Sequence, residues 1–169
     1  MSQIKLSTRL SMKDYLNVNF FMFFNRMTMK VLMGLGGVLL LMVPVMYSFF
    51  PGFYEEFPIF QLLFGLLLTI ALPILVYVNA REGYAKEEKI KENIVYEITQ
   101  DGLSIKGETF EGFKPWTEVK QILESKHWII FSFDKTKVNV IAKRDCAGTD
   151  LENFKTFIQN HPDIQYKPI

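Results

Sequence analysis

Two long uncharged segments lie almost next to each other in this chain, and they restrict its fold more than any other feature. Residues 31–50 and residues 57–80 contain no Asp, Glu, Lys, Arg or His. An α-helix rises about 1.5 Å per residue, so roughly 20 apolar residues cross the ~30 Å hydrocarbon core of a bilayer. The residues between the two segments begin with Pro-Gly, which favours a turn. The pattern predicts a transmembrane hairpin at residues 31–80.

Basic residues flank the predicted hairpin on one side of the membrane only. Arg26 and Lys30 precede the first span, Arg81 and Lys86 follow the second, and the loop at residues 51–56 contains neither Lys nor Arg. Short loops rich in Lys and Arg stay in the cytoplasm. We therefore expect a multi-pass protein of the inner cell membrane with both termini on the cytoplasmic side.

The composition of the two spans indicates an anchor. Proton relays and ion pathways need ionisable side chains inside the membrane, and these spans have none. Pro44 and Pro73 are most simply kinks that a membrane helix tolerates. Gly34, Gly37 and Gly65 allow helix backbones to approach closely. This approach would occur either within the hairpin or in a homo-oligomer, and the sequence leaves both alternatives open.

A cytosolic segment, residues 1–30, precedes the first span. Residues 3–8 alternate polar and apolar side chains like a short strand. A juxtamembrane amphipathic helix is expected to begin near Met12, because Ser11 and Asp14 have the spacing of a capping box. Its apolar side chains recur at helical spacing: Leu16, Phe20, Phe23 and Phe24. This face would lie in the membrane interface or pack against a cytosolic module.

A cytosolic β module is predicted at residues 93–169. Apolar residues alternate with period two, and an Asp-Gly turn at residues 101–102 indicates a hairpin. Thr149 and Glu152 have capping-box spacing ahead of an apolar helical stripe at residues 151–159. We expect an α+β module in which this helix covers one antiparallel sheet of about five strands. The strand-like runs are residues 94–99, 103–107, 110–113, 119–123, 128–133 and 137–142.

Two further segments adjoin this module. Residues 81–92 are charged, with Glu and Lys spaced four residues apart, and they predict a helical connector. The strand-like residues 3–8 would add a further strand to the sheet, a pairing that the sequence leaves open.

Several short motifs, taken in chain order, resemble those of the YcxB-like family of bacterial membrane proteins. They are Asp14-Tyr15 ahead of the two-span hairpin, WTEV at residues 116–119, IAKR at residues 141–144 and a terminal helix that carries Phe. The resemblance implies a two-helix transmembrane hairpin with a PH-like cytosolic domain. It implies no enzymatic activity, since none is established for that family.

No residue pattern indicates catalysis, a cofactor or a metal site. Cys146 is the only cysteine, which excludes an intrachain disulfide and a thiolate metal cluster. A nucleophile pair of Cys146 and His127 lacks a third group that would position it. Residues 81–169 carry nearly balanced charge, which argues against nucleic-acid binding. We expect a protein that is not an enzyme and needs no cofactor.

Seven residues are candidates for contact with a lipid or a protein partner: Arg26, Lys30, Arg81, Lys86, Trp116, Lys143 and Arg144. Trp116 is more simply a core anchor, and Lys143 with Arg144 is either a solvated strand end or a site for an anionic headgroup. The leading hypothesis is a membrane-anchored module that presents a sheet edge or groove to a membrane-associated protein partner. The alternative is a module that senses anionic lipid.

Overall fold

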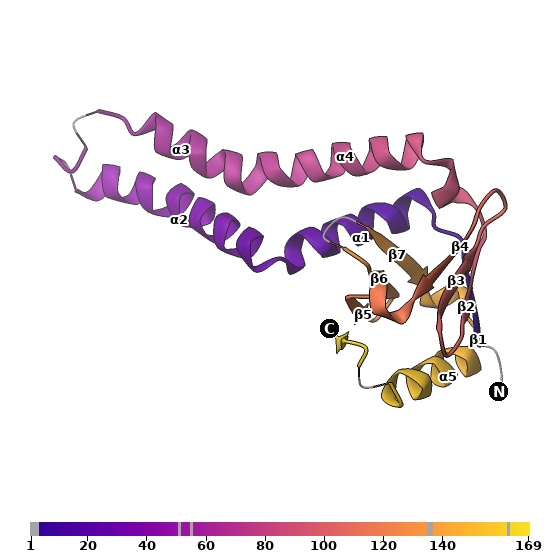
Figure 1. The fold of residues 1–169 in the computed structure, drawn as a ribbon. Helices are drawn as coiled ribbons and strands as arrows, with labels where there is room; N and C mark the ends of the chain where they lie inside the picture. Colours follow the sequence, from indigo (N-terminus) through magenta and orange to yellow (C-terminus); the bar gives the residue numbers. More distant parts are fainter. Residues whose placement is uncertain (1–3, 51, 55, 135–136, 162) are drawn as a thin grey trace. The chain divides into compact units, whose positions relative to one another are not determined.

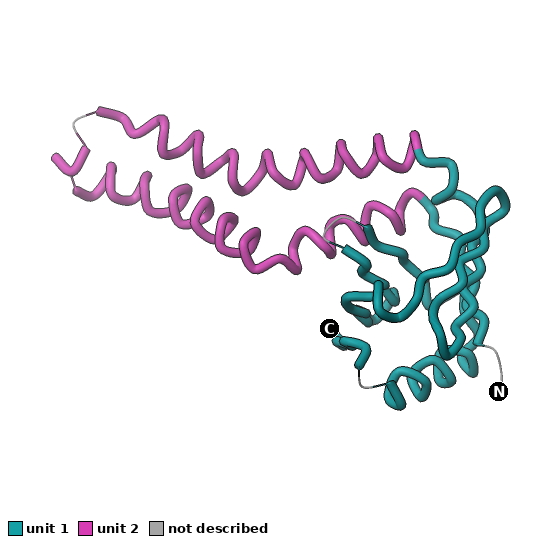
Figure 2. The backbone as a smooth tube through the Cα atoms, in the orientation of Figure 1, with its two compact units in different colours: residues 1–11, 87–169 teal, residues 12–86 magenta. Residues whose placement is uncertain are grey.

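The chain divides into two compact units, which Figure 2 distinguishes by colour. The computed structural model describes residues 4–50, 52–54, 56–134, 137–161 and 163–169. One unit contains residues 12–86 and is helical. The other contains residues 1–11 together with residues 87–169 and holds all the strands of the described chain. We call them the hairpin unit and the β module.

The hairpin unit consists of helices that pack in two antiparallel arms (Figure 1). Its elements are α1 (Met12–Asn25), α2 (Met27–Phe49), α3 (Ile59–Leu66), the π-helical segment η1 (Leu67–Ala71) and α4 (Leu72–Lys86). Two stretches, Met27–Phe49 and Ile59–Lys86, are long and apolar enough to cross a membrane. They contain most of the two spans predicted from the sequence. Pro51 and Glu55 of the predicted loop lie outside the described residues.

Glycine sets the distance between α2 and α3. A Cβ atom added at Gly36 would lie 2.7 Å from the Cβ of Leu68 and 3.0 Å from the carbonyl oxygen of Gly65. A Cβ atom at Gly65 would lie 3.0 Å from the carbonyl oxygen of Gly36. Gly65 is therefore used for packing within the hairpin, whereas Cβ atoms at Gly34 and Gly37 would meet nothing within 4 Å.

A change of helix type accommodates Pro73 in the second arm. The proline ring cannot donate a backbone hydrogen bond and clashes with the carbonyl four residues earlier in an α-helix. Directly before it, the N–H of Leu72 donates to the carbonyl of Leu67, five residues back, which is the π-helical spacing of η1. Thr69 also donates its hydroxyl to the carbonyl of Gly65 at 2.8 Å. A local π-bulge thus makes room for Pro73 in the helix, and the second arm continues as α4.

Helix α1 begins at Met12, as predicted, and packs along α4. The rings of Tyr15 and Tyr84 lie 5.8 Å apart. The buried side chains of α1 are those of Asp14 and Val18. The side chains of the predicted apolar stripe stay partly or largely exposed: Leu16, Phe20, Phe23 and Phe24. The expectation that this stripe lies in the membrane interface stays a prediction.

Two four-stranded sheets form the β module. The first, sheet A, has the antiparallel order β1-β2-β3-β4, and the second, sheet B, has the order β7-β6-β5-β8 with β8 parallel to β5. The bounds are β1 (Ile4–Thr8), β2 (Ile94–Ile98), β3 (Gly102–Lys106), β4 (Glu111–Pro115), β5 (Gln121–Glu124), β6 (Trp128–Ser132), β7 (Val138–Ala142) and β8 (Tyr166–Pro168).

The prediction of a single sheet is therefore wrong, although each of the six strand-like runs overlaps a strand of the structure. The chain turns from sheet A to sheet B at a short 3-10 helix, Trp116–Glu118, and β8 was not predicted because three residues ending in Pro168 carry little strand signal. The open question about residues 3–8 is answered, since β1 pairs with β2 along Ile4–Thr8. Gln3 of that predicted strand, and Lys135 and Thr136 of the β6–β7 turn, lie outside the described residues.

Strand β1 also joins the two sheets. The hydroxyl of Thr8, which is fully buried, donates to the Asp145 carboxylate at 3.0 Å and accepts from the Ala142 N–H at 3.1 Å. The backbone N–H of Arg9 donates to the same carboxylate at 3.2 Å. Residues near the N-terminal end of the chain thereby hold the end of β7 beside sheet A.

Helix α5 (Gly148–Gln159) packs onto the core between the sheets. Phe154 is fully buried and meets Phe131 edge-on, with ring centroids 6.0 Å apart. The helix begins three residues earlier than predicted, and Thr149 lies inside it, so the predicted capping box does not form. The N-cap residue is Ala147, which has no side-chain cap.

The predicted helical connector at residues 81–92 is interrupted. Helix α4 ends at Lys86, and a separate 3-10 helix follows at Glu88–Lys91. Glu87 between them has extended backbone angles. The end of the hairpin unit therefore coincides with a break in the helix.

Candidate functional site

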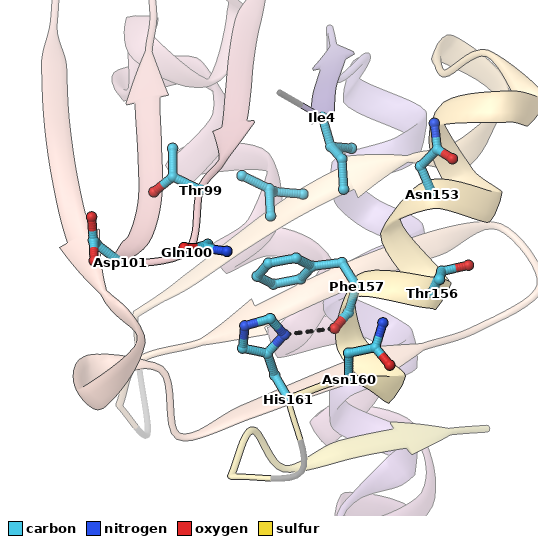
Figure 3. Close-up of a pocket in the computed structure, with 10 residues that line it drawn as sticks. Ile4, Thr99, Gln100, Asp101, Asn153, Thr156, Phe157, Asn160 and His161 are labelled. Carbon is cyan, nitrogen blue, oxygen red and sulfur yellow. Dashed lines mark hydrogen bonds between the residues drawn. The ribbon is translucent and has the colours of Figure 1, made fainter. Parts of the chain in front are cut away.

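An open cavity of about 820 Å³ lies in the β module between the β2–β3 turn and helix α5 (Figure 3). We call it the α5 groove. Ten of the described residues line it: Ile4, Ile98, Thr99, Gln100, Asp101, Asn153, Thr156, Phe157, Asn160 and His161.

One face of α5 supplies the wall of the groove. Asn153, Thr156, Phe157 and Asn160 follow the three- and four-residue spacing that places side chains on one side of a helix. Phe157 is partly buried against the core, whereas the two asparagines are exposed. Amide side chains both donate and accept hydrogen bonds, so this wall can pair with a peptide backbone or a similar polar chain.

Aromatic packing fixes the floor. The ring of His161 stacks on Phe157 with centroids 4.0 Å apart, and its Nδ1 lies 2.7 Å from the Phe157 carbonyl oxygen. Figure 3 shows this contact at the end of α5. Trp116 supports Phe157 from the core side at a centroid distance of 5.5 Å. The floor is therefore held in position independently of any ligand.

The β2–β3 turn forms the opposite rim. Thr99 closes it, because its hydroxyl donates to the Gly102 carbonyl at 2.9 Å and accepts the Gly102 N–H at 3.2 Å. Asp101 brings the one carboxylate of the described lining, and none of the ten residues is Lys or Arg. The groove is thus polar at its rim, apolar at its floor and without a basic side chain among its described lining residues.

Trp116 lies beside the groove rather than in it. Its indole N–H donates to the Thr99 carbonyl at 3.0 Å, and its ring packs against the core. Of the two alternatives for this residue, the structure supports a core anchor that fixes the β2–β3 turn and Phe157. Trp116 acts on the groove by holding its walls.

Lys143 and Arg144 are neighbours in sequence but differ in their burial and in their ion-pair partners. Lys143 is largely buried and forms an ion pair with Glu124, a buried carboxylate that also pairs with Lys155 at 3.2 Å and accepts from the Tyr166 hydroxyl. Lys143 is therefore part of an internal network and not a solvated strand end. Arg144 remains exposed beside Asp145, 3.3 Å from its carboxylate.

The remaining candidate residues belong to the hairpin unit and are all exposed: Arg26, Lys30, Arg81 and Lys86. Lys86 pairs with Glu82 at 3.1 Å. Arg26 occupies the junction between α1 and α2 as the N-cap residue of α2. The structure does not bring these four together with the α5 groove in one unit.

A second, more charged cavity of about 650 Å³ lies elsewhere in the β module. Its lining includes Lys114, Lys120 and Lys137, with Glu118 and Asp134. Lys114 and Glu118 form an ion pair at 2.7 Å. This cavity has the basic character that the α5 groove lacks.

Cys146 is protected rather than activated. Its thiol lies 3.6 Å from the Ser7 carbonyl and 3.7 Å from the Ala142 carbonyl. Burial, and after it the negative charges of Asp145 and Asp150, raise the pKa of the thiol to about 11. A nucleophilic cysteine needs the opposite shift, so these surroundings do not support a Cys146–His127 pair.

The groove residues were not among the sites predicted from the sequence. Asn153, Thr156, Phe157 and Asn160 carry a recognisable spacing, but a polar helix face is most often only solvated. The β2–β3 turn and α5 are some fifty residues apart in the chain. Their meeting depends on how the two sheets pack, which no local pattern reveals.

The molecule is thus an α+β protein in which a two-sheet module with a C-terminal helix is joined to an apolar helical hairpin. Residues 98–158 match the family model described as YcxB-like protein, a range that runs from the end of β2 through most of α5. Over these residues the chain is similar to YcxB-like proteins, which confirms the resemblance seen in the motifs that fall within them. Comparison with curated proteins found no match, and comparison with solved structures found none.

Proposed function

We propose that this protein is a membrane-anchored interaction module that binds a protein partner in the α5 groove and carries out no catalysis of its own. The observation that carries this proposal is the character of the groove: a rigid aromatic floor, amide groups along one wall and no Lys or Arg in its described lining. Such a surface suits a peptide segment, which presents apolar side chains and backbone amides together. It suits an anionic headgroup poorly.

The hairpin unit is proposed to cross the inner membrane twice, with both termini in the cytoplasm. Basic residues at the open end of the hairpin favour that orientation. The pairing of β1 with β2 supports an even number of crossings, because Thr8 and Ile94 are neighbours in one sheet although the hairpin separates them in sequence. Strands on opposite sides of a membrane could not pair.

We further propose that the β module is PH-like. Two packed sheets with a C-terminal helix over the core fit the domain that the family resemblance implies. In such an arrangement the helix forms one wall of a groove, which is the place of the α5 groove here.

Site-specific photocrosslinking in native membranes tests partner binding. A photoreactive residue at Asn160, inside the groove, is expected to capture a membrane-associated protein in stoichiometric amount. The matched control is Gln159, the next residue of α5, which is exposed but does not line the groove. Asn153→Arg should abolish capture from position 160 because it places a long charged side chain across the wall. Equal capture from positions 159 and 160, or none from 160, would refute the groove as the binding site.

Anionic-lipid sensing is the alternative, supported by the lysine-lined second cavity and the four exposed basic residues of the hairpin unit. Headgroup attraction amounts to about 1 kcal/mol per basic residue and is screened by salt. Full-length protein in nanodiscs with and without phosphatidylserine separates the two readings. A change in protease protection of the β module that depends on anionic lipid and disappears at high salt would favour the alternative.

Membrane orientation is tested by labelling single cysteines at Glu55 and Lys167 in a Cys146→Ser background in intact cells. An impermeant maleimide should label position 55 and leave position 167 unlabelled until the cells are lysed. Labelling of position 167 in intact cells would reverse the orientation.

A further inference from the structure

Strand β4 is an edge of sheet A, and its backbone has a defined set of groups that point away from the sheet. β4 pairs with β3, with Leu103 opposite Lys114 and Ile105 opposite Gly112. The backbone N–H of Trp116 donates to the carbonyl of Asp101, and that of Gly107 donates to the carbonyl of Phe110. These two bonds show which residues of β4 direct their backbone groups toward β3. Backbone groups alternate along an antiparallel edge, so the outward N–H groups of β4 are those of Glu111 and Phe113. Pro115, the next outward position, offers only its carbonyl.

The side chain on this edge is unusual within the β module. Phe113 is 52% exposed, and the only other exposed large apolar side chain among the described residues of this module is Ile169. Phe113 lies across from Ser104, and its ring extends over Gly102, where the missing Cβ leaves room for it. An apolar ring at a free sheet edge is a contact site that monomeric proteins usually avoid.

The strand is held ready for pairing by the β3–β4 turn. The carboxylate of Glu92 accepts hydrogen bonds from the backbone N–H groups of Glu108 and Thr109 and from the Thr109 hydroxyl. The Gly107 N–H closes the turn onto the Phe110 carbonyl at 2.8 Å. The edge therefore needs little ordering when it binds.

We propose that β4 binds β4 of a second copy of the chain, antiparallel and centred on Phe113, so that the two A sheets become one continuous sheet. With Phe113 opposite Phe113 of the second copy, each donates its outward N–H to the other's carbonyl. Glu111 then faces Pro115 of the second copy, and its N–H donates to the carbonyl that Pro115 still offers. The missing N–H of Pro115 leaves only the Glu111 carbonyl unpaired.

The side chains of β4 are compatible with this self-pairing. Lys114 comes opposite Gly112 of the second copy, and Glu111 comes opposite Pro115, so no two like charges face each other across the new interface. The two Phe113 rings become cross-strand neighbours on the same face of the sheet. A five-residue strand that meets all these conditions in one register fits its own copy better than an arbitrary extended peptide.

Strand β8, the outer strand of sheet B that pairs with β5, lacks these features. β8 has three residues, and its Pro168 faces outward without an N–H, which blunts that edge of sheet B. If the hairpin anchors the chain as proposed, two copies meet in the plane of one membrane, which raises their effective concentration. The dimer therefore draws on the proposed anchoring but not on the α5 groove.

Disulfide crosslinking of the full-length protein in membranes tests the register in a Cys146→Ser background. Directly opposed residues at a hydrogen-bonded antiparallel pair have Cα atoms about 5.5 Å apart, within reach of a disulfide. Phe113→Cys should form a crosslinked dimer. Neither Glu111→Cys nor Pro115→Cys should form a dimer alone. In the proposed register each cysteine is offset by four positions from the same cysteine of the second copy, a distance of about 13 Å along the strand. The two should crosslink when coexpressed.

Lys106→Cys is the matched control, because this exposed residue lies on β3, one strand inside the edge. Glu111→Pro, combined with Phe113→Cys, removes an outward N–H without touching the β3 ladder and should reduce the crosslink at least fivefold. Equal crosslinking at positions 106 and 113, no dimer from Phe113→Cys in folded protein, or capture of a different protein at position 113 would each overturn the proposal. Photocrosslinking at Asn160 is independent of all these outcomes.

Discussion

The two units of this protein place the same kinds of side chain in opposite positions. In the hairpin unit large apolar side chains point outward, as at Leu41 and Phe60, which are 73% and 80% exposed. In the β module Phe131 and Phe154 are completely buried. The hairpin helices instead meet through glycine at Gly36 and Gly65. The β module therefore has a core of its own, whereas the apolar side chains of the hairpin stay exposed, which is the arrangement expected if the hairpin crosses a membrane as proposed.

The largest expected effect comes from the core of the β module. Phe154→Ala should lower the free energy of unfolding by about 3–5 kcal/mol, because it leaves a cavity beside Phe131. Both tryptophans, Trp116 and Trp128, lie in this module, so their fluorescence during denaturation in detergent reports on it specifically. Ile169→Ala, at a half-exposed position, is the control and should change stability by less than about 0.5 kcal/mol. A similarly small change for Phe154→Ala would remove its core role.

A smaller effect is expected from the buried ion network, which the hairpin spans lack. Glu124→Gln leaves Lys143 largely buried without its counter-charge and should cost about 2–3 kcal/mol by the same fluorescence measurement. Glu118→Gln breaks the half-exposed pair with Lys114 and should cost no more than about 0.5 kcal/mol. If both substitutions cost the same, the Glu124 network is not an internal support of sheet B.

The helix contact of the hairpin should respond to added volume. Gly36→Leu places atoms where Leu68 and the Gly65 backbone already lie, and overpacking of this kind costs about 1–3 kcal/mol. Gly37→Leu, one residue along, points into open space and should leave the hairpin intact. Unfolding in increasing mole fractions of SDS, followed by circular dichroism, measures both. A larger loss for Gly37→Leu would indicate that Gly37 is the contact, for instance with a second copy.

The last effect leaves stability unchanged and concerns reactivity. Because the pKa of Cys146 is raised to about 11, its thiolate fraction at pH 8 is small and grows about tenfold per pH unit up to that value. Maleimide labelling of Cys146 at pH 8 should be on the order of tenfold to a hundredfold slower than labelling of a cysteine at exposed Lys167. Equal rates at pH 8 would mean that the thiol is neither buried nor close to Asp145.

The parts of this fold that local patterns encode were predictable, and the parts that depend on packing were not. Long uncharged runs and the Asp-Gly turn placed the hairpin helices and the β2–β3 pair. The division of one expected sheet into two follows from the turn at Trp116–Glu118, which has no distinctive sequence signal. The early start of α5 at Gly148 was missed because the cap is Ala147, a residue without a capping side chain.

Among the candidate site residues, Trp116 is the core anchor that the sequence suggested. Lys143 was expected at a solvated strand end or at a headgroup site, but it is largely buried in an ion pair with Glu124. A Lys-Arg pair at a strand end is usually solvated, and only the arrangement of Glu124, Lys155 and Tyr166 around it shows that Lys143 is internal. The α5 groove arises between a turn and a helix that are remote in sequence. Neither the sequence of the turn nor that of the helix indicates a groove by itself.

The pairing of β1 with β2 has a consequence for how the protein is made. Residues 4–8 leave the ribosome before their partner strand, residues 94–98, which follows only after the whole hairpin has been synthesised. During that interval β1 is an unpaired strand, and the Thr8 hydroxyl that will join the two sheets has no sheet to join. If the hairpin inserts into the membrane as proposed, insertion brings the two ends of this long loop together and so removes much of the entropic cost of closing it. In that case the membrane acts as a template for a domain that lies outside it, and failure of insertion would leave the β module unfinished as well as unanchored.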